Sequence, residues 1–427
     1  MEAAAYEARA AAASGKDYRK LVVLAVLHMA QYFPAAFAGT AIPFLFRKEG
    51  LPLEMFWLLA LPGYTRFLKW AMALVVDNFG SRRIGRRKSW IIPCTLIGAA
   101  SYALLALFPP SLTLLHIIVG ILIFKSFVMA AQDIAVDAYA AESMTDEERP
   151  LGTSLINFLG GVAGTLGTGA VIVVEMFGWE LTMIAASAML IIAALPAVLR
   201  KEPPPPEATQ RREARGERPS LLTAFKRKDS AFILPFMFLF GFGASFLGSM
   251  VPPFWADKGL SLTEYGTLSA IGVAAGGALA ATAIPWLVGR LGLRRTGTIG
   301  LSVVPLQAFM YFTFSEMENL PIWPVLIGSY VLAAFGVSLY SYAASISRFR
   351  WASKAQAGTD YALQSSIWNL GVSAAASVSG FVAASLGWSL FFPIAAATIC
   401  VGGLFYLILF NRIERLVQER ELTEIQD

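Results

Sequence analysis

Two acidic residues, Asp133 and Asp137, interrupt a long apolar run and are the first candidates for chemistry. Side chains four residues apart share one face of a helix. Asp133 lies roughly 13 Å along that helix from Glu142, so we expect it to be buried. Ionisable side chains at such depth usually face the interior of a helix bundle and pair with each other or with a substrate. Both acids are candidates for proton coupling; a structural ion pair for Asp133 and an interfacial position for Asp137 are the alternatives.

Three cations, Arg66, Lys69 and Lys125, also lie inside apolar runs. They outnumber the acids that lie near them in sequence, so we expect a positively charged cleft in the N-terminal half of the chain. The field of a low-dielectric cleft attracts opposite charge, which makes all three residues candidates for binding an anionic substrate. The alternative is that they pair internally or extend their charged ends to the membrane interface.

Other polar residues lie within the apolar runs. His28 can titrate near physiological pH and is a candidate for proton coupling, with a hydrogen-bonded packing role as the alternative. Its neighbour Gln31 is a candidate for substrate binding. Asp360 follows Gly358-Thr359, so it is either a gating residue or the cap of a helix N-terminus. The C-terminal half offers four further candidates for substrate binding: Tyr340, Tyr342, Gln364 and Asn369.

The composition indicates what positions these residues. Of 427 residues, 56% are hydrophobic and 15% are charged, and the mean hydropathy is +0.60, well outside the usage of soluble domains. We therefore expect an all-α integral membrane protein with about twelve spans of roughly 20 residues. Cys94 and Cys400 lie in different apolar runs, which predicts neither a metal site nor a disulfide. The net charge of +5 comes mostly from loop cations, so we expect no nucleic-acid binding.

A polar linker divides the chain into two halves. It contains Pro203 to Pro206 and many charged residues, a composition typical of a solvated hinge. The first apolar run follows a charged segment without a small-residue cleavage site, so we interpret that segment as a tail and not as a signal peptide. The predicted divisions are a tail (1–19), a six-helix bundle (20–199), the linker (200–229), a second six-helix bundle (230–411) and a C-terminal tail (412–427).

A dense cationic loop, Asp77 to Lys88, orients the predicted helices, because Lys and Arg are retained on the cytoplasmic side of a membrane. The loops of the predicted outer face hold only Arg47, Lys48 and Lys258. Both termini and the linker are therefore predicted to be cytoplasmic.

The two halves repeat each other. Short glycine-containing stretches recur at a nearly constant separation, each on an equivalent predicted loop: Gly50-Leu51 with Gly259-Leu260, Gly85 with Gly292, Gly152-Thr153 with Gly358-Thr359, and Gly178-Trp179 with Gly387-Trp388. Two parallel six-helix repeats related by an axis along the membrane normal are the architecture of the major facilitator superfamily.

The cationic loop also resembles a motif of that superfamily. Asp77-Asn78-Phe79-Gly80 followed by Arg82-Arg83 is similar to the D-R-x-G-R loop motif between helices two and three, with Asn78 as a departure. The longer loop ending in GRRKSW and the stretch Gln132 to Tyr139 resemble AmpG-like permeases, which include muropeptide importers and acetyl-CoA transporters. Gly358 to Tyr361 and the predicted 12-helix length look closer to RhtX/FptX-type siderophore importers.

This resemblance implies a secondary transporter with two pseudo-symmetric six-helix bundles. The loop motif makes Asp77, Gly85, Arg86 and Arg87 candidate gating residues, in a latch that breaks as the two halves rock; a topology signal with solvated charge is the alternative. No phosphate loop, nucleotide-hydrolysis motif, metal-ligand cluster or nucleophile arrangement is recognisable, so we expect neither an enzyme nor a bound cofactor.

We therefore expect a monomeric, lipid-embedded transporter of a bacterial inner membrane that moves a medium-sized anionic solute with proton coupling. A ferric siderophore is the first expectation for the solute, with muropeptides or acyl-CoA as the alternative. A transport-inactive receptor or partner subunit is the alternative from another class.

Overall fold

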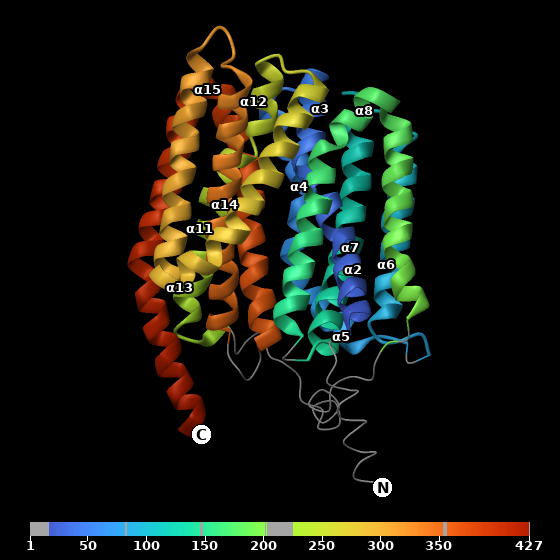
Figure 1. Cartoon of the computed structure of the whole chain (residues 1–427), viewed down its shortest axis with the longest axis vertical. Helices are drawn as coiled ribbons and strands as arrows, with labels where there is room; N and C mark the ends of the chain where they lie inside the picture. The colour runs from blue at the N-terminus through green and yellow to red at the C-terminus, as the bar shows by residue number, and fades with distance from the viewer. Residues whose placement is uncertain are drawn as a thin grey trace.

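The structure is a computed structural model that describes residues 17–81, 83–145, 148–200, 202, 225–352 and 357–426. The described part is helical and contains no β-strand beyond one isolated bridge between Ser81 and Gly85. In Figure 1 the helices run side by side in two groups, the N-terminal half in blue and green and the C-terminal half in yellow to red. The predicted tail 1–19 and linker 200–229 lie mostly outside the described residues, so their boundaries stay predictions.

Each half is a series of long helices with short connections. The N-terminal half consists of α2 (Tyr18–Ala36), η1 (Phe37–Ala41), α3 (Ile42–Lys48), η2 (Leu53–Met55), α4 (Trp57–Tyr64), η3 (Thr65–Leu68), α5 (Lys69–Asn78), α6 (Lys88–Leu105), α7 (Leu115–Ser143) and α8 (Arg149–Leu199). The C-terminal half consists of α11 (Ser230–Gly248), α12 (Val251–Asp257), α13 (Leu262–Glu316), α14 (Trp323–Trp351) and α15 (Ala357–Gln426). Large apolar and aromatic side chains of both halves join in one extended core.

Three of these helices are too long to cross a membrane once. At 1.5 Å per residue, the 51 residues of α8 would extend roughly 76 Å, against about 30 Å for the hydrocarbon core. Within each of these three helices the chain reverses direction at a glycine with positive φ: Gly178 at 83°, Gly292 at 80° and Gly387 at 71°. A residue without Cβ adopts this conformation at little cost, so α8, α13 and α15 each contain two limbs.

The positive-φ glycines follow the sequence repeat. Among the described residues they are Gly50, Gly85, Gly178, Gly259, Gly292 and Gly387, which form three of the four glycine pairs found in the sequence. Corresponding loops of the two halves therefore each turn at a glycine with positive φ, as two copies of one unit would.

Eight helices within the described segments have the length and hydropathy to span a membrane, and three of these run through the glycine turns. The all-helical membrane fold is therefore confirmed. The number of twelve spans stays a prediction.

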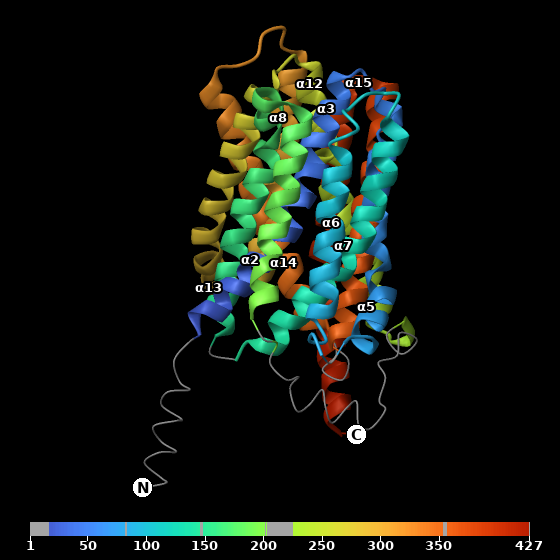
Figure 2. The same ribbon diagram turned by 90° about the vertical axis from the view of Figure 1, so that its right-hand side faces the viewer.

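The helix ends define two faces of the molecule. α2 begins and α15 ends at one end, which we call the terminal face; α3 and α12 lie at the opposite end, the distal face (Figures 1 and 2). At the distal face the halves meet through Arg47 and Asp257, with Nε to Oδ1 at 2.5 Å and Nη2 to Oδ2 at 2.9 Å. The rings of Phe44 and Tyr265 stack beside this pair with centroids 4.1 Å apart. These contacts hold the two halves together at the distal face, and we call them the distal gate.

An ionic cluster at the terminal face ties α2 to α8. The carboxylate of Glu148 accepts hydrogen bonds from Lys20 Nζ at 2.5 Å and from the backbone N–H groups of Asp17 at 3.1 Å and Thr145 at 3.0 Å. Burial raises the pKa of Glu148, but these hydrogen bonds outweigh it and lower the pKa from 4.5 to about 2. The ionised carboxylate therefore stabilises the fold.

Replacing Glu148 is expected to destabilise the protein at neutral pH. A carboxylate with a lowered pKa stabilises the fold while it is ionised, and this contribution disappears as the pH falls from about 4.5 towards 2. Glu148→Gln should cost about 3 kcal/mol at pH 7, since one pKa unit corresponds to about 1.4 kcal/mol. Thermal unfolding in detergent between pH 7 and pH 3 measures this, with Glu318→Gln, an exposed acid, as control. Parallel pH profiles of Glu148→Gln and the parent would contradict the assignment.

Candidate functional site

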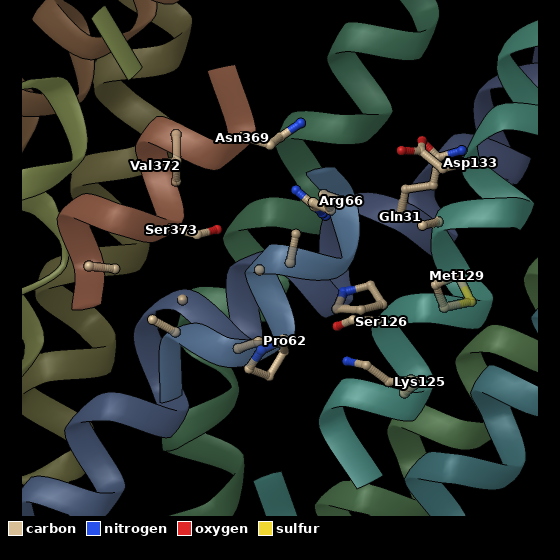
Figure 3. A pocket seen from close by; sticks show the side chains of 18 of the residues that line it. Gln31, Pro62, Arg66, Lys125, Ser126, Met129, Asp133, Asn369, Val372 and Ser373 are labelled. Atoms are coloured by element: carbon tan, nitrogen blue, oxygen red, sulfur yellow. The ribbon is translucent and has the colours of Figure 1, made fainter. Parts of the chain in front are cut away.

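A cavity of about 230 Å³ lies between the two halves. Its lining comes from α2, the α4 and η3 segment and α7 on one side and from α15 on the other. Figure 3 shows Arg66 and Lys125 on the N-terminal side and Asn369 and Ser373 on the C-terminal side. The cavity therefore lies where two rocking halves would enclose a solute.

Irregular helix geometry makes room for this cavity. Pro34 lies inside α2 just before the π-helical η1, and Pro62 lies inside α4 just before the 3₁₀ segment η3; both line the cavity. Proline removes a backbone donor and disturbs the helical hydrogen bonds. Gly63 lets α15 approach closely, because a Cβ there would lie 2.6 Å from Ser373 Oγ.

Asp133 lines the cavity and forms an ion pair with Lys69. The two side chains are only 17% and 16% exposed. The sequence left two interpretations open for Asp133, a functional role and a structural ion pair. The structure contains the ion pair, and because Asp133 also lines the cavity, its carboxylate is accessible to a solute. Removing either partner would leave the other charge without its counter-ion, at a cost that depends on how well the cavity solvates it.

Two further cations of the cavity have no acidic partner among the described residues. Lys125 is 2% exposed, lies 3.1 Å from Tyr102 Oη, and has its ammonium 4.6 Å from the centre of the Tyr102 ring. Arg66 is half-buried and makes no ion pair or hydrogen bond within the described segments. Since Asp133 is already neutralised by Lys69, the cavity has an excess of positive charge.

His28 and Asp137 lie together but outside the cavity lining. His28 Nδ1 donates to the backbone oxygen of Leu24 at 2.7 Å, and Nε2 lies 3.3 Å from Asp137 Oδ1. A carbonyl only accepts, so Nδ1 carries a proton; a hydrogen bond between Nε2 and the carboxyl then needs a second, shared proton. The imidazole of His28 therefore links α2 to Asp137 of α7.

The C-terminal candidates divide between cavity and core. Asn369 lines the cavity and donates to the backbone oxygen of Ser365 at 2.8 Å. Tyr340 packs among Phe240 and Trp368. Tyr342 is half-buried against core residues, and Gln364 is 2% exposed. From the N-terminal half, Gln31 lines the cavity and its amide nitrogen has no hydrogen-bond partner.

The described contacts of the gating candidates stay within one half. Arg86 and Arg87 both donate to the Glu142 carboxylate of α7, at 3.0 Å and 2.6 Å. Gly85 has φ of 116°, and a side chain there would collide with Glu202, which accepts from the backbone N–H groups of Arg87 and Lys88. The side chain of Asp77 lies outside the described part of the chain.

Asp360, the remaining gating candidate, is 1% exposed and accepts from Arg227 Nη2 at 2.5 Å. This ion pair joins the beginning of α15 to the segment before α11, both in the C-terminal half.

Sequence reasoning missed two cations that the structure makes conspicuous. Arg47 had been interpreted as an outer-loop charge, but its pair with Asp257 joins the halves, and Trp388 Nε1 donates to the same carboxylate at 2.9 Å. Arg348 stands beside the aromatic rings of Tyr361 and Trp368. The scarcity of cations in the outer loops was the available signal for Arg47; nothing in the local sequence singled out Arg348.

The comparison with known families agrees with this geometry. The model of the Major Facilitator Superfamily matches residues 24–323 and 233–424. The chain belongs to the major facilitator superfamily. This confirms the fold class expected from the repeat, and with it the expectation of a multi-pass membrane transporter that is not an enzyme.

Relatives place this superfamily member near the AmpG permeases. A Rickettsia conorii transporter that carries the name AmpG 4 is 23% identical, over 93% of this chain and 97% of that protein. The anhydromuropeptide permease of Escherichia coli K12 is 22% identical, over 92% of this chain and 80% of the permease. The AmpG-like resemblance is thus confirmed, whereas the siderophore importer resemblance has no support in these relatives.

Solved structures share the fold. The nucleoside transporter NupG superposes with a TM-score of 0.68 at 15% identity, covering 91% of this chain and 98% of NupG. A POT family transporter crystallised with 5-aminolevulinic acid gives 0.70 at 13% identity, covering 92% and 96% of the two chains. These structures support the architecture of the superfamily.

Proposed function

We propose that this transporter imports an anhydromuropeptide-like, polyanionic solute by alternating access, coupled to protons. The observation that carries the proposal is the cavity between the halves, in which Arg66 and Lys125 have no acidic partner among the described residues and Asp133 is neutralised by Lys69. Muropeptides bear several carboxylates, which suit this excess of positive charge. The relationship to the anhydromuropeptide permease supports the same solute class.

The residues have distinct roles in the proposed cycle. Arg66 and Lys125 attract the carboxylates of the solute, and Gln31 and Asn369 orient its neutral polar groups. Asp133 exchanges Lys69 for a proton as the cavity changes its access, because the ion pair and the protonated acid are alternative ways to neutralise the carboxylate. His28 of α2 and Asp137 of α7 form a second pair, one helical turn from Asp133, that belongs to the proposed proton path.

The proposed setting is a bacterial inner membrane, with the protein monomeric among lipids and both termini cytoplasmic. The cationic loop Asp77 to Lys88 supports this orientation, and the location of the start of α2 and the end of α15 at the same face is consistent with termini on one side.

Arg66→Gln is expected to raise the half-saturation concentration for an anhydromuropeptide by about tenfold or more, since losing one partner of a buried charged contact costs at least about 1.4 kcal/mol. Counterflow of labelled anhydromuropeptide in proteoliposomes measures it. Arg290→Gln, which removes an exposed cation outside the cavity, is the matched control.

The same assay separates the alternatives. Ferric siderophores and acyl-CoA serve as competing probes, and a receptor without transport activity would bind solute with no flux. Equal transport of a neutral or cationic solute by the parent and Arg66→Gln would refute both the anion assignment and the role of Arg66.

A further inference from the structure

A cation of the C-terminal half, Arg348, lies in an unusual environment near the end of α14. Its guanidinium carbon is 5.2 Å from the centre of the Trp368 ring and 5.8 Å from that of Tyr361, and Nη2 lies 2.8 Å from Ser345 Oγ. The buried Nε has no hydrogen-bond partner among the described residues. Aromatic faces hold a guanidinium in place without neutralising it.

Its neighbour Arg350 provides a contrast on the same helix. The Arg350 side chain is 51% exposed and pairs with Glu414 at 2.5 Å. Arg348 is half-buried and has no acidic partner among the described residues. A cation that serves only topology or the helix dipole needs no such burial, so Arg350 fits that role and Arg348 does not.

Arg348 also lies within electrostatic range of a charged residue of the N-terminal half, Lys69. Lys69 lies within electrostatic range of both Arg348 and Arg66. Tyr32 of α2 lies within electrostatic range of Arg66 on its own half and of Tyr361 on the other. Cations of both halves therefore lie near one another beside the cavity, and Asp137 is an acid that lies among them.

We propose that Arg348 is a second anion-binding position, which takes a carboxylate of the peptide part of the solute while Arg66 and Lys125 hold another anionic group. Like charges from opposite halves repel, and an anion placed between them removes the repulsion and draws the halves together. The position therefore selects solutes with at least two separated anionic groups. This inference rests on the proposed function, because it concerns the same solute.

Two probes that differ in charge test it: the anhydrodisaccharide with its peptide, which bears several carboxylates, and the same disaccharide without the peptide, which keeps the lactyl carboxylate. In counterflow, Arg348→Gln should raise the half-saturation concentration for the peptide-bearing probe about tenfold or more. It should leave that of the peptide-free probe within about twofold of the parent. Arg350→Gln is the matched control and should change neither.

Arg348→Lys keeps the charge but loses the planar stacking, so it should raise the half-saturation concentration for the peptide-bearing probe by an intermediate factor. This variant replaces Arg348→Gln in the test if Arg348→Gln does not purify as a folded protein. Equal effects of Arg348→Gln on both probes, or an effect on neither, would overturn the second anion-binding position and leave the proposed function standing. A parent that transports neither probe would refute the proposed function, and the inference with it.

Discussion

Asp133→Asn is expected to abolish uphill accumulation of solute while the protein still folds and still exchanges solute at equal concentration. Asparagine matches aspartate in size but cannot take up and release a proton. The variant therefore loses the ion pair with Lys69, and it also loses the protonated state that would replace this ion pair in the transport cycle. Asp133 lines the cavity and is 17% exposed, so cavity water can solvate the Lys69 ammonium left behind. The folding penalty should therefore be smaller than for a fully buried pair.

Proteoliposomes separate the two activities. Accumulation under an imposed proton gradient should fall to the level of empty vesicles, whereas counterflow without a gradient should remain measurable. Glu180→Gln, which neutralises an exposed acid, controls for the loss of one negative charge. If Asp133→Asn concentrates solute at the parental rate, Asp133 is a structural partner of Lys69 and the coupling lies elsewhere.

The two pairs share helix α7. Lys69 and Asp133 connect α5 to α7. One helical turn further along α7, Asp137 contacts His28 of α2. In the proposed cycle, Asp133 is the acid about one helical turn away that would accept a proton from the region of His28 and Asp137. Loss of Asp133 should thus affect proton coupling more severely than loss of either His28 or Asp137.

The sequence predicted those features that depend on local pattern. The glycine pairs were recognisable because a turn that needs positive φ restricts the residue type at one position, and the same turn recurs in both halves. Charges inside apolar runs, such as Arg66 and Asp133, were recognisable because the surrounding residues already place them within the membrane. Both kinds of signal need only a short stretch of chain.

Features that depend on partners distant in sequence were not predictable. Tyr340 and Asn369 both looked like cavity residues, and only the packing of α14 and α15 shows that one faces the aromatic core and the other the cavity. Arg47 has the sequence context of a loop charge, because nothing local to it indicates that it meets Asp257 across the halves. Arg348 sits near a helix end, where cations are common.

The distal gate leads to the second large effect: Gly380→Val is expected to prevent its closure. The backbone of α15 passes so close to η2 that a Cβ on Gly380 would lie 2.3 Å from the backbone oxygen of Leu53 and 3.2 Å from Phe56 Cβ. Backbone atoms cannot move aside as a flexible side chain can. Overpacking of this kind destabilises a structure by about 1–3 kcal/mol. Since only the conformation with the distal gate closed would be destabilised, the transport rate should fall about 10- to 100-fold.

Thiol labelling reports the state of the gate directly. Ser377 lies at the interface, where its Oγ is 3.1 Å from Tyr64 Oη. In a background with Cys94 and Cys400 replaced by serine, Ser377→Cys should react with a membrane-impermeant reagent from the distal side faster when Gly380→Val is present. Gly277→Val is the matched control, because a Cβ at Gly277 meets no neighbouring atom. If Gly380→Val transports solute and is labelled at the same rates as the parent, the prediction is contradicted. In that case α15 and η2 can move apart without opening a path, and the Arg47–Asp257 pair alone closes the gate.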